Sequence, residues 1–158
     1  MQGIFPVLQT PINDDGSINF DDLKKQVTFC IQTGAHGLVF PVLGGEFHYL
    51  SDRERYEGLQ CVVAANAGQI PVVAGVAAPS APVAAEHAAQ AAQANANAVI
   101  AMPPYITPAK GDDLIDYFKA ISNAAQLPIM VQHARIAPMG TAVLKRLLDE
   151  VEHIEYIK

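Results

Sequence analysis

The sequence HIEYIK, residues 153–158, is the stretch on which the interpretation of the fold depends. Side chains alternate between the two faces of a β-strand, so a strand here places Ile154, Tyr156 and Lys158 on one face. A lysine at the end of an apolar strand is either solvated or held in a dry pocket, where a lowered pKa makes its amine a nucleophile. The rest of the chain has to decide between these two alternatives.

Apolar runs of strand length alternate with helical patterns along the whole chain. The predicted strands are residues 4–9, 37–42, 71–76, 98–102, 128–132 and 153–158. The predicted helices are residues 20–33, 51–67, 81–94, 112–125 and 140–151. Six strands and five helices in strict alternation indicate an α/β fold with a parallel sheet, and strands that are apolar throughout indicate that both faces are covered.

Local signals support the helices. Asn19 is a predicted N-cap, and Ser51 with Glu54 has the spacing of a capping box. Residues 81–94 are mostly alanine, the best helix former, so we expect a helix with a slim packing face there.

Two architectures fit this alternation, an open doubly wound sheet and a (β/α)8 TIM barrel. The open sheet typically carries a glycine-rich dinucleotide motif after its first strand, and residues 8–13 (LQTPIN) contain no glycine. A complete barrel needs about 250 residues. The chain ends on a strand whose apolar edge would be exposed. We therefore expect residues 1–158 to be a single domain, the N-terminal portion of a barrel in a longer protein, with about six strands and five helices.

Composition limits the classes of function. The chain is 51% hydrophobic and 16% charged, which is typical of a globular protein, and its net charge of −6 argues against nucleic-acid binding. No apolar run of about 18 residues predicts a membrane span, and we expect a cytoplasmic protein. Cys30 and Cys61 are predicted to be buried free thiols, and no spacing of cysteine and histidine indicates a metal site.

Polar residues follow several predicted strands, where the loops of a barrel carry its chemistry. These candidates are Thr10, Gly44, Gly45, Tyr105, Gln132, His133, Arg135 and Lys158. The backbone N–H groups of a Gly-Gly turn suit a carboxylate or a phosphate, although such a pair is also a common simple turn. His133 is a candidate acid or base and Arg135 a candidate anion clamp; structural or surface roles are the alternatives.

Several motifs together resemble one family. They are Thr10-Pro11, VLGGEF at 42–47, LSDRER at 50–55, PPY at 103–105 and IEYIK at 154–158. In this order they are similar to the dihydrodipicolinate synthase / N-acetylneuraminate lyase family of class I pyruvate-dependent aldolases and dehydratases.

The resemblance implies a (β/α)8 barrel, usually assembled as a homotetramer, that uses no cofactor. It implies that Lys158 forms a Schiff base with a small-molecule 2-oxo acid. It also implies that the loop from Val42 to Glu46 holds the carboxylate of that acid, with Leu43, Gly44 and Gly45 as its substrate-binding residues.

The sequence departs from the family pattern where hydroxyl groups are expected. The usual hydroxyl pair falls on Leu43 and Gly44, a strand tyrosine falls on Gln132, and the second of two tyrosines falls on Ile106. Dihydrodipicolinate synthase relays protons through these hydroxyls, so we do not expect this protein to be that enzyme. His133 is the nearest candidate for proton transfer.

We therefore predict a carbon–carbon or carbon–oxygen lyase of the class I aldolase type. Imine formation at Lys158 would precede either aldol cleavage or condensation, or dehydration of a 2-oxo-3-deoxy sugar acid. The alternative is a barrel that has lost the hydroxyl relay and serves as a binding or regulatory protein.

Overall fold

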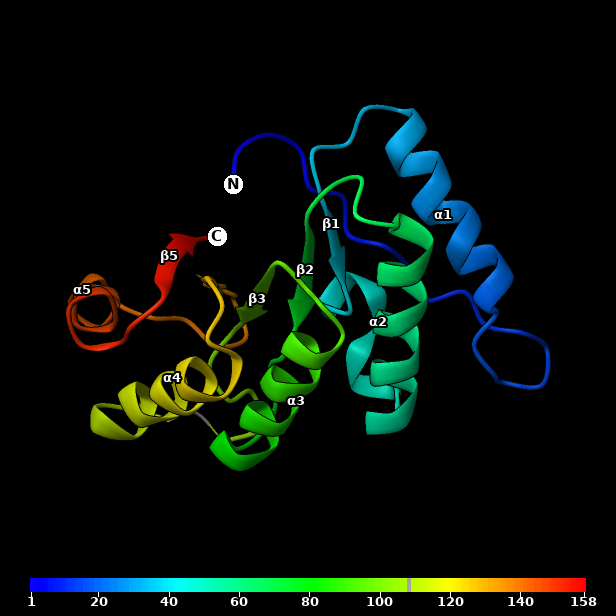
Figure 1. The fold of residues 1–158 in the computed structure, drawn as a ribbon. Coiled ribbons are helices and arrows are strands. Elements are labelled where there is room, and N and C mark those ends of the chain that lie inside the picture. The colour runs from blue at the N-terminus through cyan, green and yellow to red at the C-terminus, as the bar shows by residue number, and fades with distance from the viewer. Residues whose placement is uncertain (108) are drawn as a thin grey trace. The chain divides into compact units, whose positions relative to one another are not determined.

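The computed structural model describes residues 1–107 and 109–158, and among them five α-helices alternate with five strands (Figure 1). The helices are α1 (Phe20–Gln32), α2 (Asp52–Asn66), α3 (Ala81–Gln93), α4 (Asp112–Ala125) and α5 (Thr141–Glu150). The strands are β1 (Leu38–Phe40), β2 (Val72–Gly75), β3 (Ala98–Ala101), β4 (Ile129–Val131) and β5 (Ile154–Ile157). Two 3₁₀ turns, η1 (Leu43–Gly45) and η2 (Phe47–Tyr49), follow β1.

All five predicted helices and the last five predicted strands are confirmed, with strands shorter than expected. The prediction of a regular strand at residues 4–9 is wrong, because this segment makes only an isolated parallel bridge from Val7 to Val39. Leu8 N–H donates to Val39 O (3.1 Å) and Val39 N–H donates to Pro6 O (3.0 Å). Pro6 has no N–H to extend this pairing.

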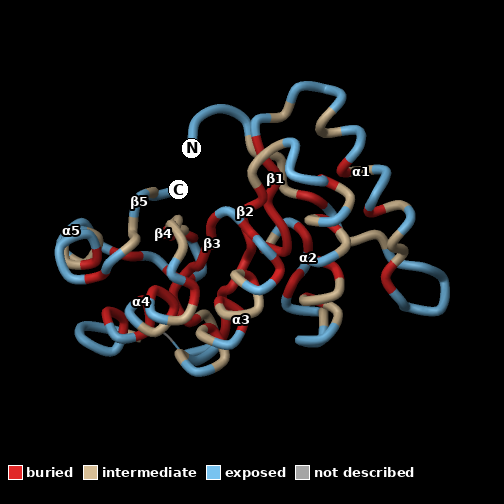
Figure 2. Tube along the Cα trace, viewed as in Figure 1, coloured by how far each residue is buried: buried red, intermediate tan, exposed pale blue. Residues whose placement is uncertain are grey.

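The described residues form two compact units, of which the first comprises Met1–Gly75 and Ala94–Asn97. In it β1 pairs with β2 in parallel, with Leu38 opposite Val72 and Phe40 opposite Ala74. Helices α1 and α2 pack together, and Figure 2 shows β1 and β2 as buried.

Both N-terminal caps predicted for this unit are present. The Asn19 side chain accepts from Asp22 N–H (2.9 Å). Ser51 and Glu54 form a complete capping box, in which the hydrogen bonds from Ser51 lower the pKa of the Glu54 carboxyl. Short-range sequence signals therefore determine where α1 and α2 begin.

The second unit comprises Val76–Gln93 and Ala98–Lys158. Here β3, β4 and β5 pair in parallel, with Val99 opposite Ile129 and Ile129 opposite Ile154, and the register shifts between Ile129 and Met130. Helix α3 packs on α4 through a buried face that is mainly alanine. No helix among the described residues is long and apolar enough to span a membrane.

The two cysteines depart from the prediction of full burial. Both are free, and both are only half-buried, since each lies on an outer helix whose fully buried positions are occupied by other side chains. Partial burial raises the pKa of both the Cys30 and the Cys61 thiol, because it disfavours the thiolate.

Tyr117 stabilises the loop that follows β2. Its hydroxyl accepts from Ala78 N–H (3.0 Å) and donates to Ala78 O (3.2 Å), and the tyrosine is 1% exposed. Replacing Tyr117 by Phe leaves both groups of a buried residue without this partner. We expect Tyr117→Phe to lower the free energy of unfolding by about 1–3 kcal/mol, measured by urea denaturation.

Tyr49→Phe is the matched control, since Tyr49 is 79% exposed. We expect it to change the free energy of unfolding by less than about 0.5 kcal/mol. Equal unfolding midpoints for the two variants would contradict the role assigned to the Tyr117 hydroxyl.

Candidate functional site

In η1, the first of the two 3₁₀ turns after β1, some backbone N–H groups are bonded within the turn and others are not. Gly45 N–H donates to Val42 O (2.8 Å) and Glu46 N–H donates to Leu43 O (3.0 Å). Glu46 then takes the left-handed conformation (φ 57°), which ends η1 and begins η2. The carbonyls of Val42 and Leu43 are thereby directed toward the C-terminal end of the turn.

The N–H groups of Leu43 and Gly44 consequently point the opposite way. In a trans peptide the N–H lies antiparallel to the carbonyl of the same unit, and these two amides share units with the Val42 and Leu43 carbonyls. No hydrogen bond described for residues 1–107 and 109–158 engages either N–H. The prediction that Gly44 and Gly45 both offer a free N–H group is wrong for Gly45, because its N–H is bonded within the turn.

Close packing explains the glycine at position 45. Gly45 is buried, and a Cβ there would lie 2.7 Å from Leu8 O. The Thr10 hydroxyl donates to Gly45 O (2.6 Å), so Thr10 contacts the turn directly. The structure thus places Thr10 beside Leu43, Gly44 and Gly45, the residues of the predicted carboxylate loop.

Arg55 is a buried residue of the same unit that the sequence interpretation missed. It is 6% exposed, its Nη2 donates to Gly75 O (3.1 Å), and its guanidinium carbon lies 4.9 Å from the centroid of the Phe47 ring. Arg55 thus connects α2 to the end of β2 and to η2. Its position is visible in the sequence, since it shares a helical period with Leu59 and Val62, which are also buried.

In the second unit, the backbone of Lys158 is fixed against β4. Lys158 N–H donates to Val131 O (2.9 Å), and His133 N–H donates to Lys158 O (2.8 Å). Side-chain alternation in β5 is as predicted, with Ile154 and Tyr156 half-buried and Glu155 and Ile157 exposed. Lys158 itself is exposed among residues 1–158.

His133 and Gln132 follow β4 directly. Gln132 is half-buried and donates its N–H to Ala101 O (2.8 Å). His133 is exposed, and its Nδ1 accepts from Met139 N–H (3.3 Å). A neutral imidazole with Nδ1 as acceptor carries its proton on Nε2. Strand pairing therefore brings Gln132, His133 and Lys158 to the same end of β4 and β5.

Arg135 and Tyr105 lie in loops of the second unit. Arg135 is exposed, in a turn closed by the bridge between Ala134 and Ala137. Tyr105 is half-buried after β3, and Ile106 beside it is 72% exposed. Nearer to Lys158, a hydrogen bond with the Glu155 carboxylate raises the pKa of the Tyr156 phenol.

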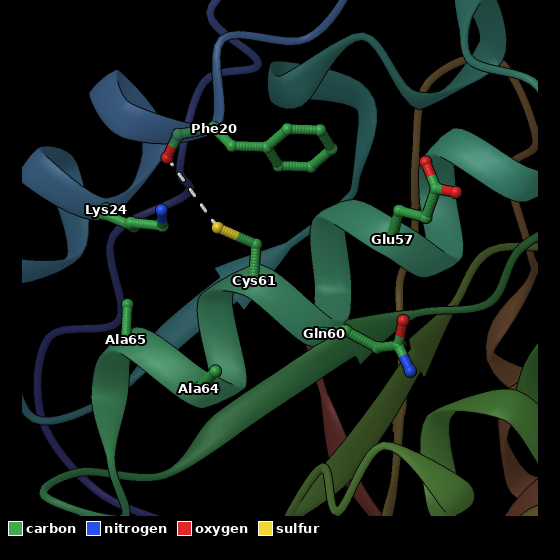
Figure 3. A pocket seen from close by; sticks show the side chains of 7 residues that line it. All are labelled: Phe20, Lys24, Glu57, Gln60, Cys61, Ala64 and Ala65. Atoms are coloured by element: carbon green, nitrogen blue, oxygen red, sulfur yellow. Dashed lines mark hydrogen bonds between the residues drawn. The ribbon is translucent and has the colours of Figure 1, made fainter.

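Two cavities of the first unit differ in their relation to these residues. A cavity of about 670 Å³ lies between α1 and α2 and is lined by Phe20, Lys24, Glu57, Gln60, Cys61, Ala64 and Ala65 (Figure 3). None of the predicted site residues lines it. A cavity of about 220 Å³ includes Thr10 and Glu46 in its lining. The described residues contain no cluster of three metal-ligating side chains.

Comparison with known proteins gives a consistent result over the whole chain. The model of the dihydrodipicolinate synthetase family matches residues 1–158. An L-2-keto-3-deoxyarabonate dehydratase of Azospirillum brasilense is 32% identical, with 99% of this chain and 52% of that protein covered. A 4-hydroxy-tetrahydrodipicolinate synthase of Methanococcus vannielii is 30% identical, with 100% and 55% covered.

Solved structures show the same relationship. YagE from E. coli K12, a prophage protein of the dihydrodipicolinic acid synthase family in complex with pyruvate, has a TM-score of 0.94 at 27% identity, with 99% of this chain and 53% of that chain covered. N-acetylneuraminate lyase from Mycoplasma synoviae has a TM-score of 0.88 at 25% identity, with 99% and 54% covered.

The chain spans about half the length of the curated relatives that it matches. The predicted fold class is confirmed, since the parallel α/β fold matches these structures over nearly all of the chain. The sequence motifs, the strand topology and the family match lead to one conclusion: this chain belongs to the dihydrodipicolinate synthetase family.

Proposed function

We propose that the protein is a Schiff-base-forming lyase that acts on a 2-oxo acid, with Lys158 as the nucleophile. The observation that carries this proposal is the position of Lys158 at the end of β5, where hydrogen bonds with Val131 and His133 fix its backbone. Relatives named as a dehydratase and a lyase, and a relative solved with pyruvate, support the reaction class.

The chemistry follows from the amine. The neutral Lys158 Nζ attacks the C2 carbonyl of the 2-oxo acid, and the resulting carbinolamine loses water to give a protonated imine. That cation accepts the electron pair left on C3 when the C3–C4 bond breaks in aldol cleavage, or when a C3–H bond breaks as the first step of dehydration. In dehydration the enamine so formed returns the pair to form the C3–C4 double bond, while the C4 hydroxyl leaves with a proton as water. No metal or bound cofactor takes part in this scheme, because the imine itself is the electron sink.

The carboxylate of the 2-oxo acid would be bound by the N–H groups of Leu43 and Gly44. Backbone donors suit this role in a chain with a net charge of −6, because they attract an anion without needing a positive side chain. Family membership is the ground for assigning both Lys158 and this turn to one substrate. Arg135 and Tyr105 remain predicted contributors.

His133 would transfer the proton. Its Nδ1 accepts from Met139 N–H, so the neutral ring presents an N–H at Nε2 and acts first as a donor. Dehydration of a 2-oxo-3-deoxy sugar acid takes a proton from C3 and gives one to the departing C4 hydroxyl, whereas aldol cleavage takes a proton from the C4 hydroxyl and gives one to C3. The N–H at Nε2 would serve the donating step of either reaction. Gln132 takes the place of the usual tyrosine and would contribute hydrogen bonding only.

A second function is favoured by the missing hydroxyl groups. Leu43, Gly44, Ile106 and Gln132 stand where the family pattern has hydroxyl side chains, and a protein without that relay could bind a 2-oxo acid without turning it over.

We also propose, from the resemblance, that the protein is a homotetramer in the cytoplasm. Analytical ultracentrifugation tests this assembly by measuring the mass of the particle in solution.

Borohydride trapping tests the nucleophile. Incubation with pyruvate and sodium borohydride should add one reduced pyruvate to the protein by mass spectrometry, and Lys158→Ala should lose the adduct. Lys145→Ala, which removes an exposed amine on α5, should keep it. An adduct that survives in Lys158→Ala would assign the imine to another lysine. If the wild-type protein forms the adduct but turns over no sugar acid, the proposal of a lyase would be replaced by the proposal of a binding protein.

Substitution in the turn tests the carboxylate site. Gly45→Ala places a Cβ 2.7 Å from Leu8 O, so the turn must move. We expect the pyruvate concentration that gives half-maximal trapping to rise about tenfold, equivalent to about 1.4 kcal/mol of binding energy. Gly140→Ala is the control, since its Cβ meets no atom within 4 Å. Equal half-maximal concentrations in the two variants would argue against the turn as the carboxylate site.

A further inference from the structure

The hydrogen bond from Thr10 to Gly45 joins two segments that are far apart in sequence. The Thr10 hydroxyl donates to Gly45 O at 2.6 Å across 35 residues of chain. Gly45 is buried and Thr10 is half-buried, so the bond is largely protected from competition by water. It is the one hydrogen bond described for Gly45 O among residues 1–107 and 109–158.

This bond completes the hydrogen bonding of the turn. Gly45 O is the last carbonyl of η1, and such carbonyls lack a partner within the turn. The peptide unit that it shares with Glu46 is held at its other end by the bond from Glu46 N–H to Leu43 O (3.0 Å). With Thr10 in place, this unit is fixed at both ends, and its orientation fixes the units before it.

Thr10 is itself held on a rigid backbone. Leu8 N–H donates to Val39 O (3.1 Å), and Gln9 N–H donates to the Gln26 side chain (3.1 Å). Asn19 N–H donates to Pro11 O (2.8 Å) on the other side. The Thr10 hydroxyl therefore has a fixed position. A group can orient a neighbouring peptide unit only if its own position is fixed.

We propose that Thr10 is a positioning residue that sets the preference of the site for a carboxylate. By holding Gly45 O, it directs the free N–H groups of Leu43 and Gly44 to one point. This inference rests on the proposed function. It differs from the expectation that Thr10 touches the substrate, since the Thr10 proton is donated to the protein backbone.

The two informative variants are Thr10→Val, which keeps the shape and removes the hydroxyl, and Thr10→Ser, which keeps the hydroxyl. Borohydride trapping is measured with pyruvate and with acetone, which has the same ketone and no carboxylate. In Thr10→Val we expect the pyruvate concentration that gives half-maximal trapping to rise about tenfold, because one protected hydrogen bond is lost. The acetone concentration that gives half-maximal trapping, and the trapping rate at saturation, should stay within about twofold of the wild-type values. Thr10→Ser should match the wild type with both probes.

Two results would overturn the proposal. One is that Thr10→Val leaves the half-maximal concentrations of both pyruvate and acetone unchanged, because then the hydroxyl does not control the preference. The other is an equal loss with both probes, which would show that Thr10 only stabilises the fold.

Amide hydrogen exchange separates this proposal from the proposed function. A wild-type protein that forms no adduct with either probe contradicts the imine at Lys158. In that case the orientation of the turn is read from the exchange rates of the Gly45 and Glu46 N–H groups. We expect exchange about tenfold faster in Thr10→Val than in Thr10→Ser. Equal exchange in the two variants would overturn the role of Thr10.

Discussion

Parallel pairing of β5 with β4 is the constraint on which the placement of Lys158 depends. The bonds from Lys158 N–H to Val131 and from His133 N–H to Lys158 continue this pairing past the last residue of each strand. The lysine therefore has a fixed backbone even though its side chain is exposed. Parallel strands end at the same edge of their sheet, so the same pairing brings His133 and Gln132 to the edge where Lys158 lies.

The turn after β1 is held by hydrogen bonds of its own backbone. Its internal hydrogen bonds use the carbonyls of Val42 and Leu43, and among residues 1–107 and 109–158 no described hydrogen bond engages the N–H groups of Leu43 and Gly44. Hydroxyl side chains, which the family pattern has at this point, are replaced by Leu43 and Gly44. In the proposed site, binding of a carboxylate would depend on backbone donors, which substitution of side chains alone does not remove.

Much of the fold could be predicted because its signals are local. The caps at Asn19 and Ser51 and the apolar periodicity determine the helices, and all of them are present. The segment at residues 4–9 failed as a strand because pairing depends on both partners, and Pro6 has no N–H to contribute. The partial burial of Cys30 was not predictable from the sequence, because it depends on which face of α1 is covered.

The sequence supplied the candidate residues of the site and not the hydrogen bonding around them. Motif order identified Lys158 and the glycine turn, but which amides of the turn are free depends on the 3₁₀ geometry. Arg55 was missed because a charged side chain is normally exposed. Its burial follows from contacts with Gly75 and Phe47, which are distant in sequence.

The alanine face of α3 has a consequence for how this protein can change over time. Ala84, Ala88 and Ala91 are fully or almost fully buried, and α3 packs closely on α4. A larger side chain at any of these positions would overpack the interface at a cost of about 1–3 kcal/mol. Sequence drift at Ala84, Ala88 and Ala91 is therefore restricted to small residues, whereas exposed positions of α3, such as Glu86, are free to vary.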